Sequence, residues 1–584
     1  MKLLTVKRTV IAFVISVLVL TAFLTPAALP TTQQTVVVQG YDFNHVIQMV
    51  ARTGGEITAQ YPGLDAVVAN LSPQSIAWLS KMDGILAVTR PYQANLAGFA
   101  EDAVESPHIP ETFYPEVVGA DAVWEQGITG EGVTVAILDS GLYPFESLLK
   151  DSHGDNRLLA WKDFVDGSLN PIDPNGHGTH IAGIIANSEL GFDGEANGVA
   201  PDVDLVALRI LDENGFGELE DILAGFDWVL QHHEEYNIKV LNISMSANIL
   251  APYWADPINY AVMKAWAEGI TVITSAGNAG SEALTIGVPG NNPYIVTVGT
   301  FTDHYTPFDH TDDYMAFFSG AGPTRDGFIK PDVIAPGAHM ASLMPENNTL
   351  FLEGEATQFS GDYYRMAGTS QSAAVVSGIA ALIAQNNPGL SPDEIKYRLT
   401  NTANPMVLEE NEAAYSIFQQ GYGRVNAVEA VFAEIDGIAN QGLDINKDLA
   451  GVRHYHGMAD YNEKTETFWV RRAPKAGEAY FTWNGEFEQV TAGFGSWADG
   501  FGSWADGFGS WADGFGSWAD GFGSWADGFG SWADGFGSWA DGFGSWADGF
   551  GSWADGFGSW ADGFGSWADG FGSWADGFGS WADG

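Results

Sequence analysis

Short apolar runs alternate with segments of helical periodicity between residues 116 and 432. The runs expected to be buried strands are Val133–Leu138, Leu205–Leu208, Val240–Ile243, Val272–Thr274, Ile295–Val298 and Val333–Ala335. The helices expected between them are Thr179–Ala186, Leu219–Tyr236, Pro257–Glu268 and Ser370–Asn386. Because parallel strands need right-handed crossovers, this alternation predicts an α/β domain: a doubly wound parallel sheet with helices on both faces. Functional sites in such sheets form at the carboxyl ends of strands.

A smaller unit precedes this domain, at residues 31–95. Apolar runs and helical segments alternate there in the order βαββαβ, which predicts a ferredoxin-like α+β sandwich. Ser72-Pro73 is a typical N-cap and first-turn pair for its second helix. Residues 96–115 carry Gly, Pro and acids without periodicity, so they are expected to be a linker.

The chain ends in a heptapeptide, Phe-Gly-Ser-Trp-Ala-Asp-Gly, which repeats thirteen times over residues 494–584. Two Gly and one Asp in every seven residues oppose a helix. A turn in each unit would give a thin solenoid, and the aromatic rings suggest stacking on wall sugars or adhesion to a surface. We favour a low-complexity tail and leave its function open. Residues 433–493 carry no motif and are expected to be a spacer or a small β unit.

Charge and cysteine content exclude several classes of function. The chain has 74 Asp and Glu against 24 Lys and Arg, a net charge of −50. Such an acidic chain is repelled by nucleic acid and by anionic lipid. There is no Cys, which excludes disulfides, thiolate chemistry and cysteine-bound zinc.

The N-terminus predicts secretion. Lys2, Lys7 and Arg8 precede an apolar run, and small residues and Pro26 follow it. The run is about 15 residues long, whereas a membrane span needs about 20. Residues 1–30 are therefore expected to be a cleaved signal peptide, and the mature protein is expected outside the cell without a membrane anchor.

Four polar residues stand where parallel strands end or helices begin. Asp139 ends a strand, His177 lies between two Gly before a helix, Asn278 follows another strand, and Ser370 opens a long helix. A serine nucleophile needs a neighbouring base, the base needs a carboxylate partner, and the tetrahedral intermediate needs hydrogen-bond donors. These residues meet all three needs together. A zinc hydrolase built on His177 and His180 is the alternative, but no third ligand stands nearby in the sequence.

Six segments resemble the signature blocks of the subtilisin-like serine peptidases, in family order. They are GVTVAILDSG, NGHGTHIAG, GVAPDVDLVALRIL, SAGNAG, KPDVIAPG and MAGTSQSAAVVSG. The resemblance implies a subtilisin-like fold and an endopeptidase that acts on proteins or peptides through an acyl-enzyme. It makes Ser370 the nucleophile, His177 the general base and acid, and Asp139 the orienting acid, with Asn278 in the oxyanion hole. It also implies an inhibitor-type propeptide at residues 31–95, a partner for folding that is later cleaved off within the linker.

The resemblance further assigns the substrate-binding residues. Ser244, Met245 and Ser246 match the edge along which family members bind substrate as an added strand, and Gly287 matches the base of the main specificity pocket. An open pocket at Gly287 would accept a large apolar or aromatic side chain. Ser246, however, stands where the family usually has Gly, which narrows the cleft.

Other departures follow the nucleophile, where the family usually has Met, Ala and Pro. This chain has Gln371, Ser372 and Ala374 at those positions. No cofactor is expected for catalysis. A structural calcium is a weaker expectation, at the loop of residues 187–191 with Asp151 or Asp155. The rival function is a surface-binding or adhesive protein with an inactive peptidase domain, in which the aromatic repeat makes the cell-surface contact.

Overall fold

The computed structural model describes residues 33–96, 99–100, 112–191, 194–407, 413–462, 464–465, 467–471, 479–483, 543–544 and 551–552. The expected signal peptide, most of the linker and nearly all of the repeat lie outside these residues. The chain divides into two compact units, residues 1–60 with 67–90, and residues 61–66 with 91–584. Among the described residues, no helix combines the length and the apolar character that a membrane span requires.

The smaller unit has the expected βαββαβ order. Its elements are β1 (Gln34–Gly40), α2 (Phe43–Arg52), β2 (Glu56–Tyr61), β3 (Ala66–Leu71), α3 (Pro73–Leu79) and β4 (Ile85–Thr89). The strands pair in the order β2–β3–β1–β4, which is the order of a ferredoxin-like sheet. Asp42 and Ser72 cap the two helices with their side chains. Val38, Val46 and Val67 lie in one buried cluster between the helices and the sheet.

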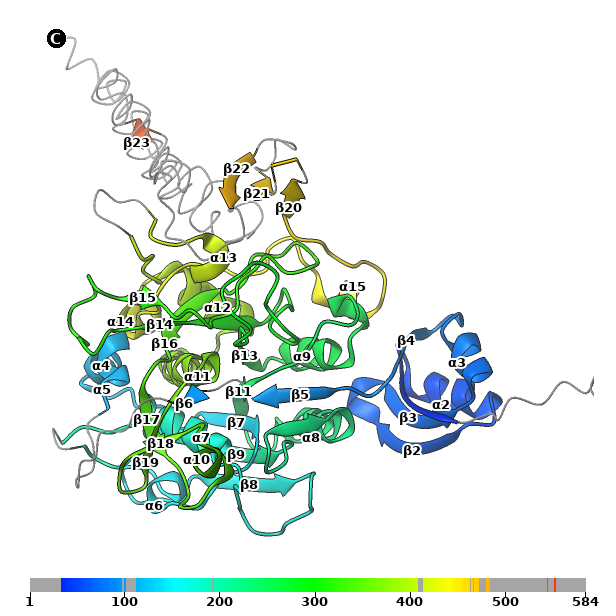
Figure 1. Cartoon of the computed structure of the whole chain (residues 1–584), viewed down its shortest axis with the longest axis horizontal. Helices are drawn as coiled ribbons and strands as arrows, with labels where there is room; N and C mark the ends of the chain where they lie inside the picture. The colour runs from blue at the N-terminus through cyan, green and yellow to red at the C-terminus, as the bar shows by residue number, and fades with distance from the viewer. Residues whose placement is uncertain are drawn as a thin grey trace, which may run out of the picture. The chain divides into compact units, whose positions relative to one another are not determined.

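The larger unit is built on a mostly parallel sheet in the order β15–β14–β13–β11–β7–β9–β8, with β16 also paired to β14 (Figure 1). Its strands are β7 (Thr134–Asp139), β8 (Leu158–Asp163), β9 (Asp204–Arg209), β11 (Ile238–Ile243), β13 (Thr271–Ser275), β14 (Val296–Thr302), β15 (Tyr314–Met315) and β16 (Val333–Pro336). Each of the six expected strands is present within a few residues of its predicted bounds. Only β15 is antiparallel to its neighbour.

Helices cover both faces of this sheet. The long ones are α7 (His177–Ala186), α8 (Leu219–His232), α9 (Pro257–Ala267) and α11 (Thr369–Asn386). Helix α11 packs against α7 and on β11, β13, β14 and β16, whereas α8 packs against α9. Helix α12 (Pro392–Asn401) is as long as α7. The shorter helices are α4 (Tyr114–Val118), α5 (Ala120–Trp124), α6 (Glu146–Leu149), α10 (Thr349–Glu353), α13 (Ile417–Gln420) and α14 (Ala427–Phe432). Nearly the whole of α11 is buried, which explains why its sequence is apolar or small on every side.

A small antiparallel sheet leads the chain into α11. It contains β17 (Met340–Leu343), β18 (Thr357–Ser360), β19 (Tyr363–Ala367) and the short strand β6 (Phe99–Ala100). Strand β19 ends two residues before Thr369, the first residue of α11. This sheet was not expected from the sequence, because its strands are short and lack a clear alternation of apolar and polar residues.

The first part of the expected spacer packs on the larger unit. Helix α15 (Ile445–Leu449) contacts α9, and its residue Asp448 is buried. One Asp448 oxygen accepts hydrogen bonds from the hydroxyls of Tyr253, at 2.5 Å, and Tyr294, at 2.9 Å. The other accepts from His454 at 2.7 Å. The residues after 432 therefore add to the core of the larger unit.

Further along, β20 (Ala459–Asn462), β21 (Thr467–Arg471) and β22 (Ala479–Trp483) form a three-stranded sheet. This sheet agrees with the expectation of a small β unit within residues 433–493. In the repeat, the two described pairs of residues form strands β23 (Phe543–Gly544) and β24 (Gly551–Ser552), which pair with each other.

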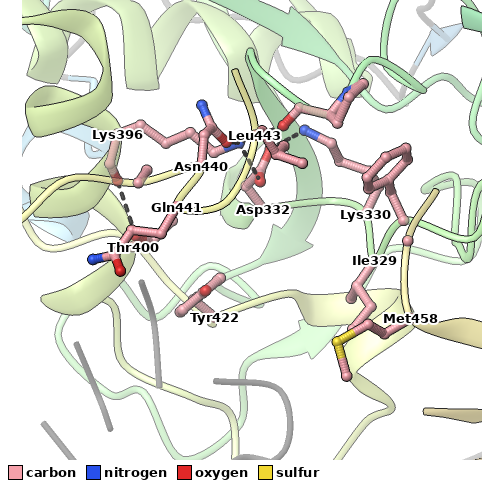
Figure 2. Close-up of a pocket in the computed structure, with 14 residues that line it drawn as sticks. Ile329, Lys330, Asp332, Lys396, Thr400, Tyr422, Asn440, Gln441, Leu443 and Met458 are labelled. Atoms are coloured by element: carbon pink, nitrogen blue, oxygen red, sulfur yellow. Dashed lines mark hydrogen bonds and ion pairs between the residues drawn. The ribbon is translucent and has the colours of Figure 1, made fainter. Parts of the chain in front are cut away.

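Two buried lysines share one carboxylate beneath the C-terminal segment. Lys330 and Lys396 approach Asp332 from different sides, with Nζ–Oδ distances of 2.5 and 3.1 Å (Figure 2). Both ammonium groups also donate to the carbonyl oxygen of Ile295. Burial lowers the pKa of Lys330 to about 7, and the opposing effect of Asp332 does not offset it. This cluster fixes the loop before β14 to the strand β16 and the helix α12.

Candidate active site

Asp139 and His177 form a buried hydrogen-bonded pair. Asp139 is the last residue of β7 and His177 is the first residue of α7, and Oδ1 of the carboxylate lies 2.8 Å from Nδ1 of the ring. Helix α7 approaches the turn after β7 closely, because Gly178 of the helix lies against Gly141 of the turn. A Cβ atom at Gly178 would lie 2.2 Å from the carbonyl oxygen of Gly141, so no larger residue fits there.

Asp173 and Ser140 hold this pair in place, and the sequence analysis did not single them out. Asp173 accepts from the backbone N–H of Gly176 and Thr179 in the first turn of α7. It also accepts from the Ser140 hydroxyl, which in turn accepts from the backbone N–H of Gly178. No local pattern pointed to Asp173, because the N-cap of α7 is Gly176 and Asp173 lies three residues further back.

Ser370 lies at the start of α11, fully buried. Its Oγ donates to the carbonyl oxygen of Ser244 at 3.2 Å, and the Ser244 hydroxyl donates to the carbonyl oxygen of Ser370 at 3.1 Å. Nε2 of His177 is buried and has no hydrogen-bond partner among the described residues. His177, the expected base, thus has an unpaired ring nitrogen, whereas the hydroxyl of Ser370 is hydrogen-bonded to a main-chain carbonyl oxygen.

Asn278 is oriented by the residue that precedes the expected nucleophile. Its Oδ1 accepts from the backbone N–H and the hydroxyl of Thr369, at 3.0 and 2.8 Å. The Thr369 hydroxyl also accepts from the backbone N–H of Gly277. With the oxygen held on this side, the Nδ2 donor is buried and makes no hydrogen bond within the described part of the chain. An unused donor beside Ser370 is what an oxyanion hole requires.

A segment of the chain itself lies between two edge strands beside Ser370. Strand β5 (Gln93–Leu96) pairs antiparallel with β10 (Phe216–Glu218) on one side and with β12 (Met245–Ser246) on the other. Leu96 stands opposite Met245, and its N–H donates to the carbonyl oxygen of Gly215. The sequence predicted the edge at Ser244–Ser246, which contains β12, but it did not predict the edge at β10. The Gly-rich turn before β10 was the signal that could have indicated it.

The chain reaches the other side of Ser370 directly after β5. Strand β6 pairs with β19, with Phe99 opposite Ala367 and Ala100 opposite Met366. Ala367 is three residues before Ser370. Strands β5 and β6 therefore pair with two segments close to the expected nucleophile: β12, which follows Ser244, and the end of β19.

Ser246 and Gly287, both expected at the substrate site, lie against each other. A Cβ atom at Gly287 would lie 2.1 Å from Oγ of Ser246, and one at Gly277 would lie 3.0 Å from the same oxygen. The Ser246 side chain thus stands between two glycines. The neighbouring bridge of Ala247 to Val288 holds these segments together.

The zinc alternative has little support in the geometry. Nε2 of His180 lies 3.1 and 3.2 Å from the carbonyl oxygens of Met340 and Tyr364, to which it donates. Burial, together with the neighbouring His177, lowers the pKa of His180 to about 3, so this ring is neutral. His177 is bound to Asp139. Within the described residues, no third ligand gathers with these two histidines.

The expected calcium loop is engaged by a tyrosine. The Tyr363 hydroxyl accepts from Asn187 and donates to Glu189, at 2.8 and 2.7 Å. Asp151 groups instead with His153 and Asp202, whose three ligand atoms lie within 4.8 Å of one another. The carboxylates there face the buried Arg157 guanidinium, which supplies positive charge. Calcium at residues 187–191 remains a prediction.

The departures after Ser370 are accommodated by the surrounding structure. The Ser372 hydroxyl hydrogen-bonds to the Thr300 hydroxyl at 2.8 Å and to the carbonyl oxygen of Ala335 at 3.0 Å. Ala374 is buried within α11. Gln371 is also buried, and neither polar atom of its amide finds a partner in the described structure.

This fold, with a buried Asp–His pair and a serine at the start of the helix α11 that packs against α7, is typical of serine peptidases. Residues 130–423 match the model of the Subtilase family. The chain is 37% identical over 311 residues to serine protease AprX of Bacillus subtilis (strain 168), covering 52% of this chain and 67% of that protein. It is 29% identical over 366 residues to subtilisin E of the same organism, covering 61% of this chain and 80% of that protein.

A solved structure shares the fold. It is fervidolysin from Fervidobacterium pennivorans, described as a keratinolytic enzyme related to subtilisin, with a TM-score of 0.52 and 21% identity. The match covers 69% of this chain and 61% of that one. Together these findings show that the chain belongs to the subtilase family and is a serine endopeptidase.

Proposed function

We propose that the chain is a secreted, propeptide-bearing endopeptidase in which Ser370 attacks the scissile carbonyl. His177 accepts the serine proton at Nε2 and returns it to the leaving amine, while Asp139 holds Nδ1 and stabilises the imidazolium. Nδ2 of Asn278 and the backbone N–H of Ser370 donate to the oxyanion. Water then hydrolyses the acyl-enzyme. Subtilases need no cofactor for this chemistry, and structural calcium remains a separate expectation.

The observation that carries this proposal is the position of β5. An extended segment hydrogen-bonded on both edges, leading to Ser370, is the arrangement in which a protease holds a peptide. We take β5 as a model of how protein substrates bind along Ser244–Ser246. Main-chain pairing gives this cleft affinity for extended peptides in general.

The same geometry supports a role for residues 31–95 as a propeptide that assists folding and inhibits the enzyme. Strand β5 ends at Leu96, which pairs with the residue after Ser244, and the Ser244 carbonyl accepts from the Ser370 hydroxyl. Strand β6 begins at Phe99, which pairs with Ala367, three residues before Ser370. The bond cleaved in maturation is therefore proposed to lie between Leu96 and Phe99, within the linker. Secretion is proposed from the N-terminal sequence at residues 1–30, and surface attachment by the repeat stays an open hypothesis.

The test is labelling with a fluorophosphonate, which reacts with an activated serine, followed by mapping of the modified residue. Label on Ser370 and hydrolysis of casein are expected from the full chain. Ser370→Ala should abolish both and leave the precursor uncleaved on a gel. Ser372→Ala is the matched control, because this residue lies two positions along the same helix and the family usually has Ala there; it should label and mature normally.

Three outcomes would contradict the proposal. Undiminished casein hydrolysis by Ser370→Ala would remove this residue from the role of nucleophile. A wild-type chain that folds but neither labels nor hydrolyses casein would favour the rival function, a binding protein with an inactive peptidase domain. Loss of hydrolysis with a zinc chelator, without loss of label, would favour the metal alternative.

A further inference from the structure

A cavity of about 110 Å³ lies against the small sheet of β17, β18 and β19. Its lining includes the buried Thr112, Met340 and Ala341 and the exposed rings of Phe113 and Tyr305, so the cavity reaches from the core to solvent. Since a cavity of about 150 Å³ holds a benzene molecule, this one has room for a group of about five heavy atoms. None of the residues that line it belongs to the expected catalytic or substrate-binding set.

Arg365, on β19, contributes a guanidinium to this lining. Its central carbon lies 3.8 Å from the centre of the Phe359 ring, so an aromatic side chain covers one face of the cation. Its Nε is buried and finds no hydrogen-bond partner among the residues that the structure describes. The N–H groups lie in the plane of the guanidinium, so the ring leaves its hydrogen-bonding edge uncovered. Because a buried donor without an acceptor is costly, this edge suits a ligand that brings the acceptor.

The carboxylate in the lining is already paired. Oδ1 of Asp303 lies 2.5 Å from Nε2 of His339, and the His339 ring stacks on Tyr305 with the ring centres 3.8 Å apart. Burial raises the pKa of Asp303, but the hydrogen bond and the charge of His339 outweigh burial and hold this pKa below its usual range. The negative charge of Asp303 is thus directed at His339, and the charge of Arg365 is left for a ligand.

This position of Arg365 differs from that of other arginines in the larger unit. Arg209 pairs with Asp163, and Arg424 pairs with Asp313. We propose that the cavity binds a monocarboxylate with a small apolar body, whose oxygens accept hydrogen bonds from the edge of the Arg365 guanidinium.

The shape and the walls of the cavity define this class of ligand. A planar carboxylate matches the fork of an arginine, and one negative charge matches the one cation that no described carboxylate pairs with. The aromatic and proline side chains in the lining suit an apolar group. Free short-chain acids and the C-terminal carboxylates of cleaved peptides share this chemistry. The inference does not depend on the proposed role of Ser370.

The test is saturation-transfer NMR, in which a small molecule takes up magnetisation from the protein that binds it. The protein is the full chain with Ser370→Ala, which prevents self-digestion, at constant ionic strength. Propionate should bind with a Kd in the millimolar range, as expected for a ligand of about five heavy atoms. Propionamide has the same shape and no charge, and it should bind at least about tenfold more weakly.

Three variants in the same background locate the site. Arg365→Met removes the guanidinium and keeps a long side chain, so the Kd for propionate should rise by about tenfold to a hundredfold. Arg365→Lys keeps the charge and loses the fork, and its Kd should lie between those two. Arg325→Met is the matched control, because Arg325 is an exposed arginine that donates to the carbonyl oxygen of Ile249, outside the cavity. Its Kd should equal that of the parent.

Acetyl-alanine distinguishes the two sources of the carboxylate. Tighter binding of acetyl-alanine than of propionate indicates the C-terminus of a peptide, and weaker binding indicates a free acid. Absence of a propionate signal, equal binding of propionate and propionamide, or equal Kd values for Arg365→Met and the parent overturns the inference. None of these outcomes bears on Ser370 as the nucleophile, because binding is measured without catalysis.

Discussion

Replacing Asp448 tests whether the segment after residue 432 belongs to the peptidase core. The carboxylate accepts the hydroxyls of Tyr253 and Tyr294, which are 0% and 1% exposed. In Asp448→Ala both hydroxyls lose their acceptor in a place that water does not reach freely. Each buried donor left without a partner costs about 1–3 kcal/mol, so the free energy of unfolding should fall by about 2–6 kcal/mol.

The assay is thermal unfolding followed by circular dichroism, in a Ser370→Ala background that prevents self-digestion. The apparent Tm of Asp448→Ala should fall on the order of 5–10 °C at a fixed scan rate. Asp448→Asn keeps one acceptor oxygen and should lose less. Asp444→Ala is the matched control: this residue caps the same helix, α15, but its side chain is 39% exposed, so the fall in Tm should be much smaller.

Equal Tm values for Asp448→Ala and Asp444→Ala would refute the reasoning. In that case the tyrosine hydroxyls would have found other partners, and the segment after 432 would pack too loosely to count as core. A chain that ends at Phe432 provides the second measurement. It should be destabilised at least as much as Asp448→Ala, because it loses the carboxylate together with the apolar contacts of α15.

Three further predictions concern catalysis, pH and the tail. Asn278→Ala should lower kcat by about 10²–10³ with little change in KM, since its donor acts on the transition state; a loss below about threefold in a folded variant would reject this role. Burial lowers the pKa of Lys330 to about 7 in the folded chain, against 10.5 in the unfolded chain. The free energy of unfolding, relative to that of Lys330→Met, should therefore rise as the pH increases between these two values. Parallel pH profiles of Tm for the two proteins in the Ser370→Ala background would argue against a titrating Lys330. A chain truncated before Phe494 should mature and cleave a soluble peptide at near full rate, but it should lose binding to cell-wall material in a pull-down. Loss of peptide hydrolysis would show that the tail is part of the catalytic fold. Unchanged binding would leave the tail a low-complexity segment.

The sequence alone predicted the parallel sheet and the polar residues at the ends of its strands, because local patterns encode them. A buried parallel strand is a continuous apolar run, and a residue at its end is conspicuous when it is polar, as Asp139 is. The glycines beside His177 are equally visible, since only Gly allows the close approach of α7 to the turn after β7. The order βαββαβ and the positions of the main helices followed from the same periodicities.

Contacts distant in sequence were out of reach of this reasoning. Strand β5 carries no alternation that predicts a strand; it is one because β10 and β12, more than a hundred residues later, offer free edges. Asp448 was indistinguishable from the many solvated acids of this chain, because its burial depends on Tyr253 and Tyr294. A local pattern cannot contain such information.

In the proposed function the cleft binds a peptide mainly through its backbone, which has a consequence for selectivity. Strands β10 and β12 contact β5 by main-chain pairing, and any extended sequence without Pro at the paired positions offers the same groups. Backbone pairing of this kind therefore discriminates little between one extended sequence and another. The chain's own linker has a different advantage, because it is tethered to the enzyme and is therefore present at a high effective concentration. Under this proposal self-cleavage stays efficient even where the cleft holds a free peptide weakly.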